Sequence, residues 1–141
     1  MPFREKSAWI ALVTTAVVYG IYFSRIAPGL LGGPGGLPDA VGAFIATVIV
    51  LVVLQIILHV AAAALAPREA QAARDERETL IELRALRAAF YVSQVGAVGV
   101  VAAVLWRGDA AFIGNVVLLC MVAAELTRAG STVLEYRRGA A

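Results

Sequence analysis

The fold is decided by the stretch Ala40–Ala66, AVGAFIATVIVLVVLQIILHVAAAALA, because its 27 residues contain a single ionisable side chain, His59. A transmembrane helix needs about 20 apolar residues, so this stretch predicts a helix that crosses a bilayer and either tilts or protrudes from it. The whole chain agrees, since 61% of its 141 residues are hydrophobic and 16% are charged, whereas soluble domains average roughly half apolar and a quarter charged. We therefore expect a membrane protein and exclude a secreted disulfide-rich chain or a disordered one.

Three further apolar blocks flank this stretch. Residues 7–24 and 88–106 carry no formal charge, and a block from residue 110 runs uncharged until Glu125 and then Arg128. The sequence predicts an all-α polytopic membrane protein, one domain over 1–141, with transmembrane helices at about 7–24, 40–66, 88–106 and 110–130. The pattern leaves open whether the last helix stops near Arg128 or continues to Arg138. The only cysteine, Cys120, lies in an apolar block, which excludes an intramolecular disulfide and favours a small core residue.

The basic residues indicate how the helices are oriented. Ten of the 12 Lys and Arg residues fall in the N-terminal segment, the central segment 68–87 and the C-terminal region, while Arg25 and Arg107 lie on the opposite side. Cytoplasmic loops carry an excess of Lys and Arg. We therefore predict that both termini are cytoplasmic and that the protein lies in a bacterial or archaeal cytoplasmic (inner) membrane. The outward linker 28–38, with five glycines and three prolines, predicts turns and no helix.

The two halves of the chain resemble each other at a spacing of 70 residues. Asp39 and Asp109 precede predicted helices, and Gln55 and Glu125 each follow 16 residues later. A parallel duplication of a two-helix unit would explain this spacing, and chance agreement among apolar residues is the alternative. If the duplication is real, we expect both aspartates to cap the helices that follow them.

Polar side chains inside the predicted spans are costly in lipid and are the first candidates for function. Gln55 and His59 share one face of a helix, and Glu125 and Arg128 share one face of another. If the second and fourth helices pack together, Glu125 can pair with His59 or Arg128 in the inner half of the membrane. Two interpretations stay open. One is a proton or cation site in a small transporter, with groups that titrate near neutral pH; the other is a clamp between helices, with Arg128 reaching the headgroups.

The central segment 68–87 predicts a cytoplasmic amphipathic helix that continues into the third span. The acidic residues Asp75, Glu76 and Glu78 precede an apolar row spaced by three or four residues, Leu80, Leu83, Leu86 and Phe90. Such a row must be buried against this chain, a second copy or a soluble partner. The candidate partner-binding residues are Asp75, Glu76, Glu78, Glu82 and Arg84. A divalent cation held by Asp75, Glu78 and Glu82 is the alternative to a solvated acidic face, and the excess of carboxylates argues against direct nucleic-acid binding.

The third span also carries small residues at helical spacing, Ala89, Ser93, Gly96, Gly99 and Ala103. Such a face lets helices approach closely, equally within one chain and in the homodimer that we expect. The single histidine and the single cysteine lie 61 residues apart and form neither a metal-ligand set nor a nucleophile with its base at a diagnostic spacing. We therefore expect no enzyme, no cofactor and no metal.

The run Asp75-Glu-Arg-Glu-Thr-Leu-Ile-Glu-Leu-Arg-Ala85, followed by the aromatic pair Phe90-Tyr91, resembles a family of small predicted bacterial and archaeal membrane proteins of unknown function. Its members carry a D-E-R-x-x-x-I motif ahead of the last helix pair. The resemblance implies a four-helix integral protein, often encoded beside a helix-turn-helix regulator, and hence a membrane partner that holds or senses a transcription regulator. It transfers no catalytic residue.

Two functional hypotheses follow from these patterns. In the first, a non-enzymatic four-helix membrane protein docks a soluble partner on its cytoplasmic face. In the second, Gln55, His59 and Glu125 serve a small ion- or proton-coupled transporter or channel component. A translocation path would need polar residues in the outer half of the spans as well, where they are nearly absent from the sequence. The sequence on its own therefore favours docking.

Overall fold

The computed structural model describes residues 3–31, 40–65, 67 and 75–138, and within these residues it has four long helices. Their bounds are Phe3–Leu30 for α1, Ala40–Leu65 for α2, Glu76–Trp106 for α4 and Ala110–Arg138 for α5. Each helix is long and apolar enough to cross a membrane. The predicted all-α architecture with four candidate transmembrane helices is therefore confirmed.

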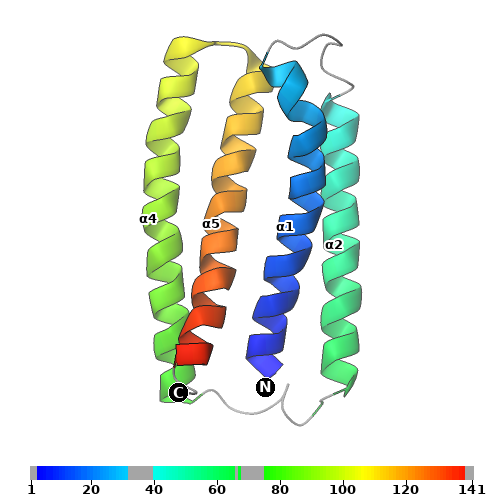
Figure 1. The fold of residues 1–141 in the computed structure, drawn as a ribbon, viewed down its shortest axis with the longest axis vertical. Helices are drawn as coiled ribbons and strands as arrows, with labels where there is room; N and C mark the ends of the chain where they lie inside the picture. Colours follow the sequence, from blue (N-terminus) through cyan, green and yellow to red (C-terminus); the bar gives the residue numbers. More distant parts are fainter. Residues whose placement is uncertain (1–2, 32–39, 66, 68–74, 139–141) are drawn as a thin grey trace.

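The helices stand side by side in the order α4, α5, α1, α2 (Figure 1). Helix α5 packs on both α4 and α1, while the extensive contact of α2 is with α1. The start of α1 and the end of α5 lie at the same end of the bundle. We call this the inner end, because the sequence predicts it to be cytoplasmic, and we call the opposite end the outer end.

Three of the helices extend beyond the bounds expected from hydropathy. Helix α5 continues to Arg138, and α4 joins the amphipathic segment to the third span in one helix, as predicted. The prediction that residues 28–38 hold no helix is wrong at its start, because α1 includes Pro28 and the Leu31 N–H still donates to the Ala27 carbonyl at 3.0 Å. A proline in the last turn removes one N–H bond and leaves the preceding turns intact. Residues 32–39, with Asp39, and residues 68–74 lie outside the described residues.

The outer connection between α4 and α5 is held by charged side chains. The Phe112 N–H donates to Asp109 Oδ1 at 2.8 Å, so the predicted cap of α5 is confirmed. Arg107 lies 2.8 Å from the same carboxylate and donates to the carbonyl of Leu30 at 2.6 Å. These contacts fasten the α4–α5 turn to the outer end of α1.

Small residues bring α4 and α5 close together. A Cβ added to Gly96 would lie 2.8 Å from Cys120 Cβ, and Cys120 Sγ donates to the Gly96 carbonyl at 3.4 Å. Ala89 and Ala103 of α4 are buried, whereas Gly99 has open space around it. The predicted small-residue face therefore serves a contact within the chain, and Cys120 packs there as expected.

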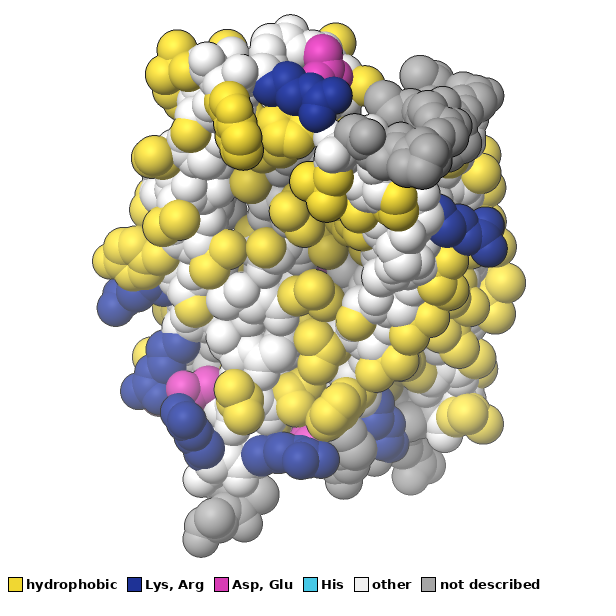
Figure 2. Space-filling view, turned by 45° about the horizontal axis from the view of Figure 1, so that its top comes forward, with side chains coloured by type: hydrophobic (Ala, Val, Ile, Leu, Met, Phe, Trp, Pro, Cys, Tyr) yellow, Lys and Arg dark blue, Asp and Glu magenta, His cyan; other side chains and the backbone are white. Residues whose placement is uncertain are grey.

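The described residues leave two apolar surfaces uncovered. None of the most apolar window of α2 is buried, and the apolar row of α4 (Leu80, Leu83, Leu86 and Phe90) is between 54% and 57% exposed. The described chain does not bury this row, because α4 turns Ile81, Ala85 and Ala89 toward the bundle instead. In space-filling view, hydrophobic side chains cover much of the middle of the molecule, while Lys and Arg gather along its lower edge (Figure 2).

Candidate functional site

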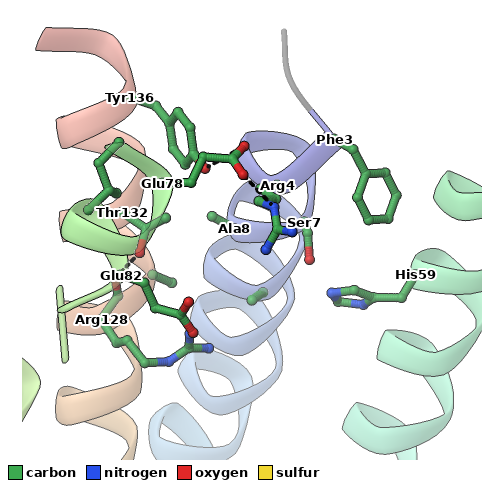
Figure 3. A pocket seen from close by; sticks show the side chains of 13 residues that line it. Phe3, Arg4, Ser7, Ala8, His59, Glu78, Glu82, Arg128, Thr132 and Tyr136 are labelled. Carbon is green, nitrogen blue, oxygen red and sulfur yellow. Dashed lines mark hydrogen bonds and ion pairs between the residues drawn. The ribbon is translucent and has the colours of Figure 1, made fainter. Parts of the chain in front are cut away.

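A cavity of about 290 Å³ opens at the inner end, and side chains from all four helices line it (Figure 3). Its wall is mixed, with charged, hydroxyl and aromatic groups facing one space. The lining residues are Phe3, Arg4, Ser7, Ala8, Ala11, His59, Glu78, Ile81, Glu82, Arg128, Ala129, Thr132 and Tyr136. Residues far apart in the sequence thus form one polar site.

The mouth of the cavity is bridged by an ion pair between α1 and α4. Arg4 Nε lies 2.9 Å from Glu78 Oε2, and the Tyr136 hydroxyl of α5 is 3.5 Å from Glu78 Oε1. Deeper in the cavity, Glu82 of α4 lies beside Arg128 of α5 (Figure 3). Both acidic residues from the inner part of α4 therefore face basic groups of neighbouring helices.

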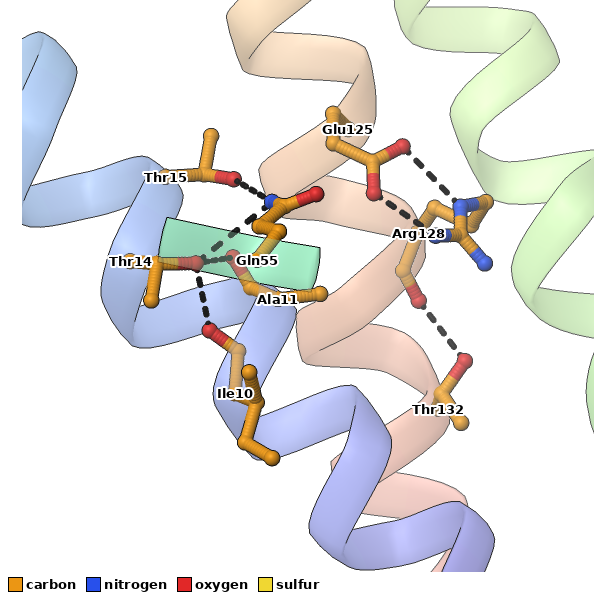
Figure 4. A network of polar contacts seen from close by, with 8 residues as sticks. All are labelled: Ile10, Ala11, Thr14, Thr15, Gln55, Glu125, Arg128 and Thr132. Carbon is orange, nitrogen blue, oxygen red and sulfur yellow. Dashed lines mark hydrogen bonds and ion pairs between the residues drawn. The ribbon is translucent and has the colours of Figure 1, made fainter. Parts of the chain in front are cut away.

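A second polar group, more deeply placed, links α2 to α1 (Figure 4). The amide of Gln55 donates to the Thr15 hydroxyl at 3.3 Å and to the Thr14 hydroxyl at 3.4 Å. Thr14 also donates to the Ile10 carbonyl of its own helix at 2.6 Å. His59 Nδ1 lies 2.8 Å from the Gln55 carbonyl oxygen, and the ring reaches the wall of the inner cavity.

Glu125 and Arg128 of α5 form a two-point ion pair. Arg128 Nη2 lies 2.6 Å from Glu125 Oε1, and Arg128 Nε lies 3.0 Å from Oε2. Of the two partners expected for Glu125, Arg128 fills the role and His59 does not, because α2 packs on α1 and the histidine bonds within its own helix. The side chains of Arg128 and Glu125 are 42% and 38% exposed, so neither charged group is buried within the chain.

A third polar group lies nearer the outer end, between α1 and α5. The Tyr22 hydroxyl donates to Asn115 Oδ1 at 2.9 Å, both residues are buried, and Asn115 Nδ2 donates to the Ala111 carbonyl. Both residues also line an outer cavity of about 240 Å³ together with Phe44 of α2. The sequence pattern did not single out Tyr22 and Asn115 as partners. The available signal was an amide six residues into an otherwise apolar block.

An apolar layer separates the outer group from the deeper ones. Tyr19 of α1 packs there with Leu118 and Val122 of α5, while Ile26 of the same cluster lies on the outer side of Tyr22. Polar groups thus occur along α1 from Arg4 to Tyr22, 18 residues or about 27 Å of helix. The layer closes the interface between the two cavities.

The predicted partner-binding residues do not share one face. Asp75 and Glu76 are exposed at the start of α4, whereas Glu78 binds Arg4 and Glu82 lines the cavity. Arg84 binds Glu135 of α5 at 3.1 Å. Only the first two acidic side chains therefore point freely outward from the inner end.

Comparisons with known proteins assign no function, so the interpretation rests on the geometry of the site. No protein-family model, curated protein or solved structure shows significant similarity to the chain. The family resemblance of residues 75–91 therefore stays a prediction. Within the described part of the chain, no three His, Cys, Asp or Glu residues are placed to hold a metal ion.

Proposed function

We propose that this protein is a small ion- or proton-coupled transporter or channel component whose path follows the α1–α5 interface. The observation that supports the proposal is the series of polar groups along α1, at its contacts with α2, α4 and α5, with a cavity near each end. A translocation path needs polar groups in the outer half as well as the inner half, and Tyr22 and Asn115 supply them there. Because of these outer polar groups we favour transport over docking, the function that the sequence alone favoured.

In this proposal Glu125 is the proton-binding group. As a carboxylate it holds Arg128 through two hydrogen bonds, and the pair keeps either charge from standing alone in a region of low dielectric. Protonation of Glu125 removes the negative partner, so that Arg128 can turn to Glu82 across the cavity. Proton uptake would then change the contacts between α5 and α4.

In this proposal α2 is the helix that moves relative to α1 during transport. It carries Gln55 and His59, contacts the bundle mainly through α1, and has no buried residue in its most apolar window. Displacing α2 therefore costs less apolar packing than displacing any of its neighbours. The Gln55 bonds to Thr14 and Thr15 are long, at 3.4 and 3.3 Å, which suits contacts that form and break.

The test is proton flux into liposomes that contain the purified protein and a pH-sensitive dye, driven by a potassium diffusion potential. We expect wild type to take up protons faster than protein-free liposomes, and Glu125→Gln to fall to the protein-free rate. Glu135→Gln is the matched control, because Glu135 is also a carboxylate of α5 paired with an arginine, yet its partner Arg84 does not line the inner cavity, whereas Arg128, the partner of Glu125, does.

Equal flux in the wild type and Glu125→Gln, with both proteins folded by circular dichroism, would reject the role of Glu125. A wild-type rate equal to that of protein-free liposomes, under both proton and sodium gradients, would reject the transport proposal itself.

Docking of a soluble partner is a second candidate, favoured by the exposure of Asp75 and Glu76. Helix α4 begins 11 residues before Arg87, so these carboxylates lie about 17 Å along the helix from that arginine. Acidic residues in the first turn also stabilise the helix itself, so a binding measurement is needed to separate the two roles.

Crosslinking in native cells, followed by affinity purification and mass spectrometry, tests docking. The double variant Asp75→Lys/Glu76→Lys should lose a stoichiometric soluble partner that both wild type and Glu5→Lys retain. Glu5 is a suitable control because it lies at the same end of the bundle, on α1. Equal recovery with all three proteins would exclude these two carboxylates as the docking site.

A further inference from the structure

One polar side chain of α4 faces away from the bundle in the middle of a predicted span. Gln94 is exposed, and no hydrogen bond from its side chain occurs within the described chain. It lies 12 residues from Trp106, where α4 ends, or about 18 Å along the helix. That distance places its amide near the centre of a hydrocarbon core roughly 30 Å thick, where unsatisfied polar groups are costly.

The direction of Gln94 follows from helix geometry. Ala85 and Ala103 are buried against the bundle, and each is nine residues from Gln94 in the sequence. At about 100° per residue, nine residues amount to two and a half turns. Gln94 therefore points directly away from the contact with α5, and none of the other three described helices lies on that side of α4.

Gln94 lies in a regular seam on this outward face. The seam residues alternate at spacings of three and four: Leu80, Leu83, Arg87, Phe90, Gln94, Ala97 and Val101. The apolar members Leu80, Leu83, Phe90 and Val101 are 54% to 59% exposed. An average spacing of 3.5 residues is the pattern by which two helices wrap around each other. Leu80 and Leu83 precede the arginines at the predicted membrane boundary, so lipid tails do not cover them.

We propose that a second copy of this chain packs along this seam of α4, with Gln94 of each copy donating to and accepting from Gln94 of the other. A glutamine amide carries both donor and acceptor groups, and a two-fold axis places a residue of a seam opposite itself. In a parallel pair of α4 helices, the two Gln94 side chains can therefore hydrogen-bond to each other. Amide side chains inside the membrane are known to join helices through such bonds. Arg87 lies at the boundary, where its long side chain leaves the seam for the headgroups.

The proposal is independent of the transport path, which lies on the opposite side of α5. Energy transfer between donor- and acceptor-labelled copies in liposomes, at decreasing protein-to-lipid ratios, measures the pairing. Gln94→Leu should weaken association by roughly tenfold, the effect of one intramembrane hydrogen-bonded pair, while Gln94→Asn keeps the pairing. Ser93→Ala is the control, because the Ser93 hydroxyl already donates to the Ala89 carbonyl of its own helix.

A second measurement locates the contact. In a Cys120→Ala background, which is free of cysteine, Gln94→Cys should form an oxidant-induced dimer. Val95→Cys should not, although Val95 is 74% exposed, because it points about 100° away from the seam. A wild-type protein that stays monomeric at every ratio, or unchanged association in Gln94→Leu, would overturn the proposal. Because the side chain of Gln94 has no hydrogen-bond partner among the described residues, Gln94→Leu should unfold at the wild-type temperature, so a folding defect does not obscure the result.

Discussion

The α4–α5 hairpin and the α1–α2 pair are built from helices of similar length but hold together differently. Helices α4 and α5 meet over small residues, with Gly96 packed directly on Cys120. Helix α2 meets α1 without burying any residue of its most apolar window, and it reaches α1 through the long bonds of Gln55. The difference separates two tasks: the hairpin fixes the fold, while the α1–α2 contact carries polar groups that can rearrange.

The largest effect on stability should come from a substitution that separates α4 from α5. In Gly96→Val the new Cβ would lie 2.8 Å from Cys120 Cβ, so the helices must separate, at a cost of about 1–3 kcal/mol. Gly99→Ala, three residues further along the same helix, meets open space and should stabilise by up to about 1 kcal/mol through helix propensity.

Thermal and denaturant unfolding in detergent, followed by circular dichroism, measures both changes. Equal stability of the two variants would show that α4 and α5 do not approach closely at Gly96.

The next effect concerns the outer bond between α1 and α5. Tyr22→Phe leaves the buried Asn115 oxygen without its donor, which should cost about 1–3 kcal/mol. Asn115→Leu should cost a similar amount, and the double variant should cost less than the sum, since both single changes break the same bond. A double-mutant cycle of unfolding free energies tests this expectation. Strict additivity would mean that the hydroxyl and the amide are not coupled.

Hydropathy and charge were enough to predict the four spans and the Asp109 cap, and they limited the partner of Glu125 to His59 or Arg128, of which the structure has Arg128. They could not identify the Tyr22–Asn115 bond, because whether a neutral side chain faces lipid or another helix depends on tertiary packing. The same limit explains Glu78 and Glu82, which fit a solvated acidic face by spacing alone. In the structure these residues lie on the side of α4 that faces α1 and α5. The rotation of α4 about its axis turns Glu78 and Glu82 toward the bundle. The same rotation directs Gln94 and the exposed leucines of α4 away from it.

A smaller effect on stability is expected at the α1–α2 contact. Gln55→Leu should change the free energy of unfolding by about 0.6 kcal/mol, the average for a hydrogen bond between membrane helices, while reducing proton flux strongly. Thr47→Val on the same helix is the control, because Thr47 bonds only to the Ala43 carbonyl of α2. A large loss of stability with unchanged flux would identify Gln55 as a clamp between helices and remove it from the transport path.

The smallest effect is expected at the mouth of the inner cavity. The side chains of Arg4 and Glu78 are 31% and 22% exposed, and ion pairs accessible to water contribute about 0.2–1 kcal/mol. The coupling between Arg4→Gln and Glu78→Gln should therefore be small at low salt and should vanish near 1 M salt, where charges are screened within about 3 Å. Unfolding measured at both salt concentrations tests whether the cavity opens to water. A coupling that salt leaves unchanged would mean that the pair is sealed from solvent, and a path entering from the inner end would then need another opening.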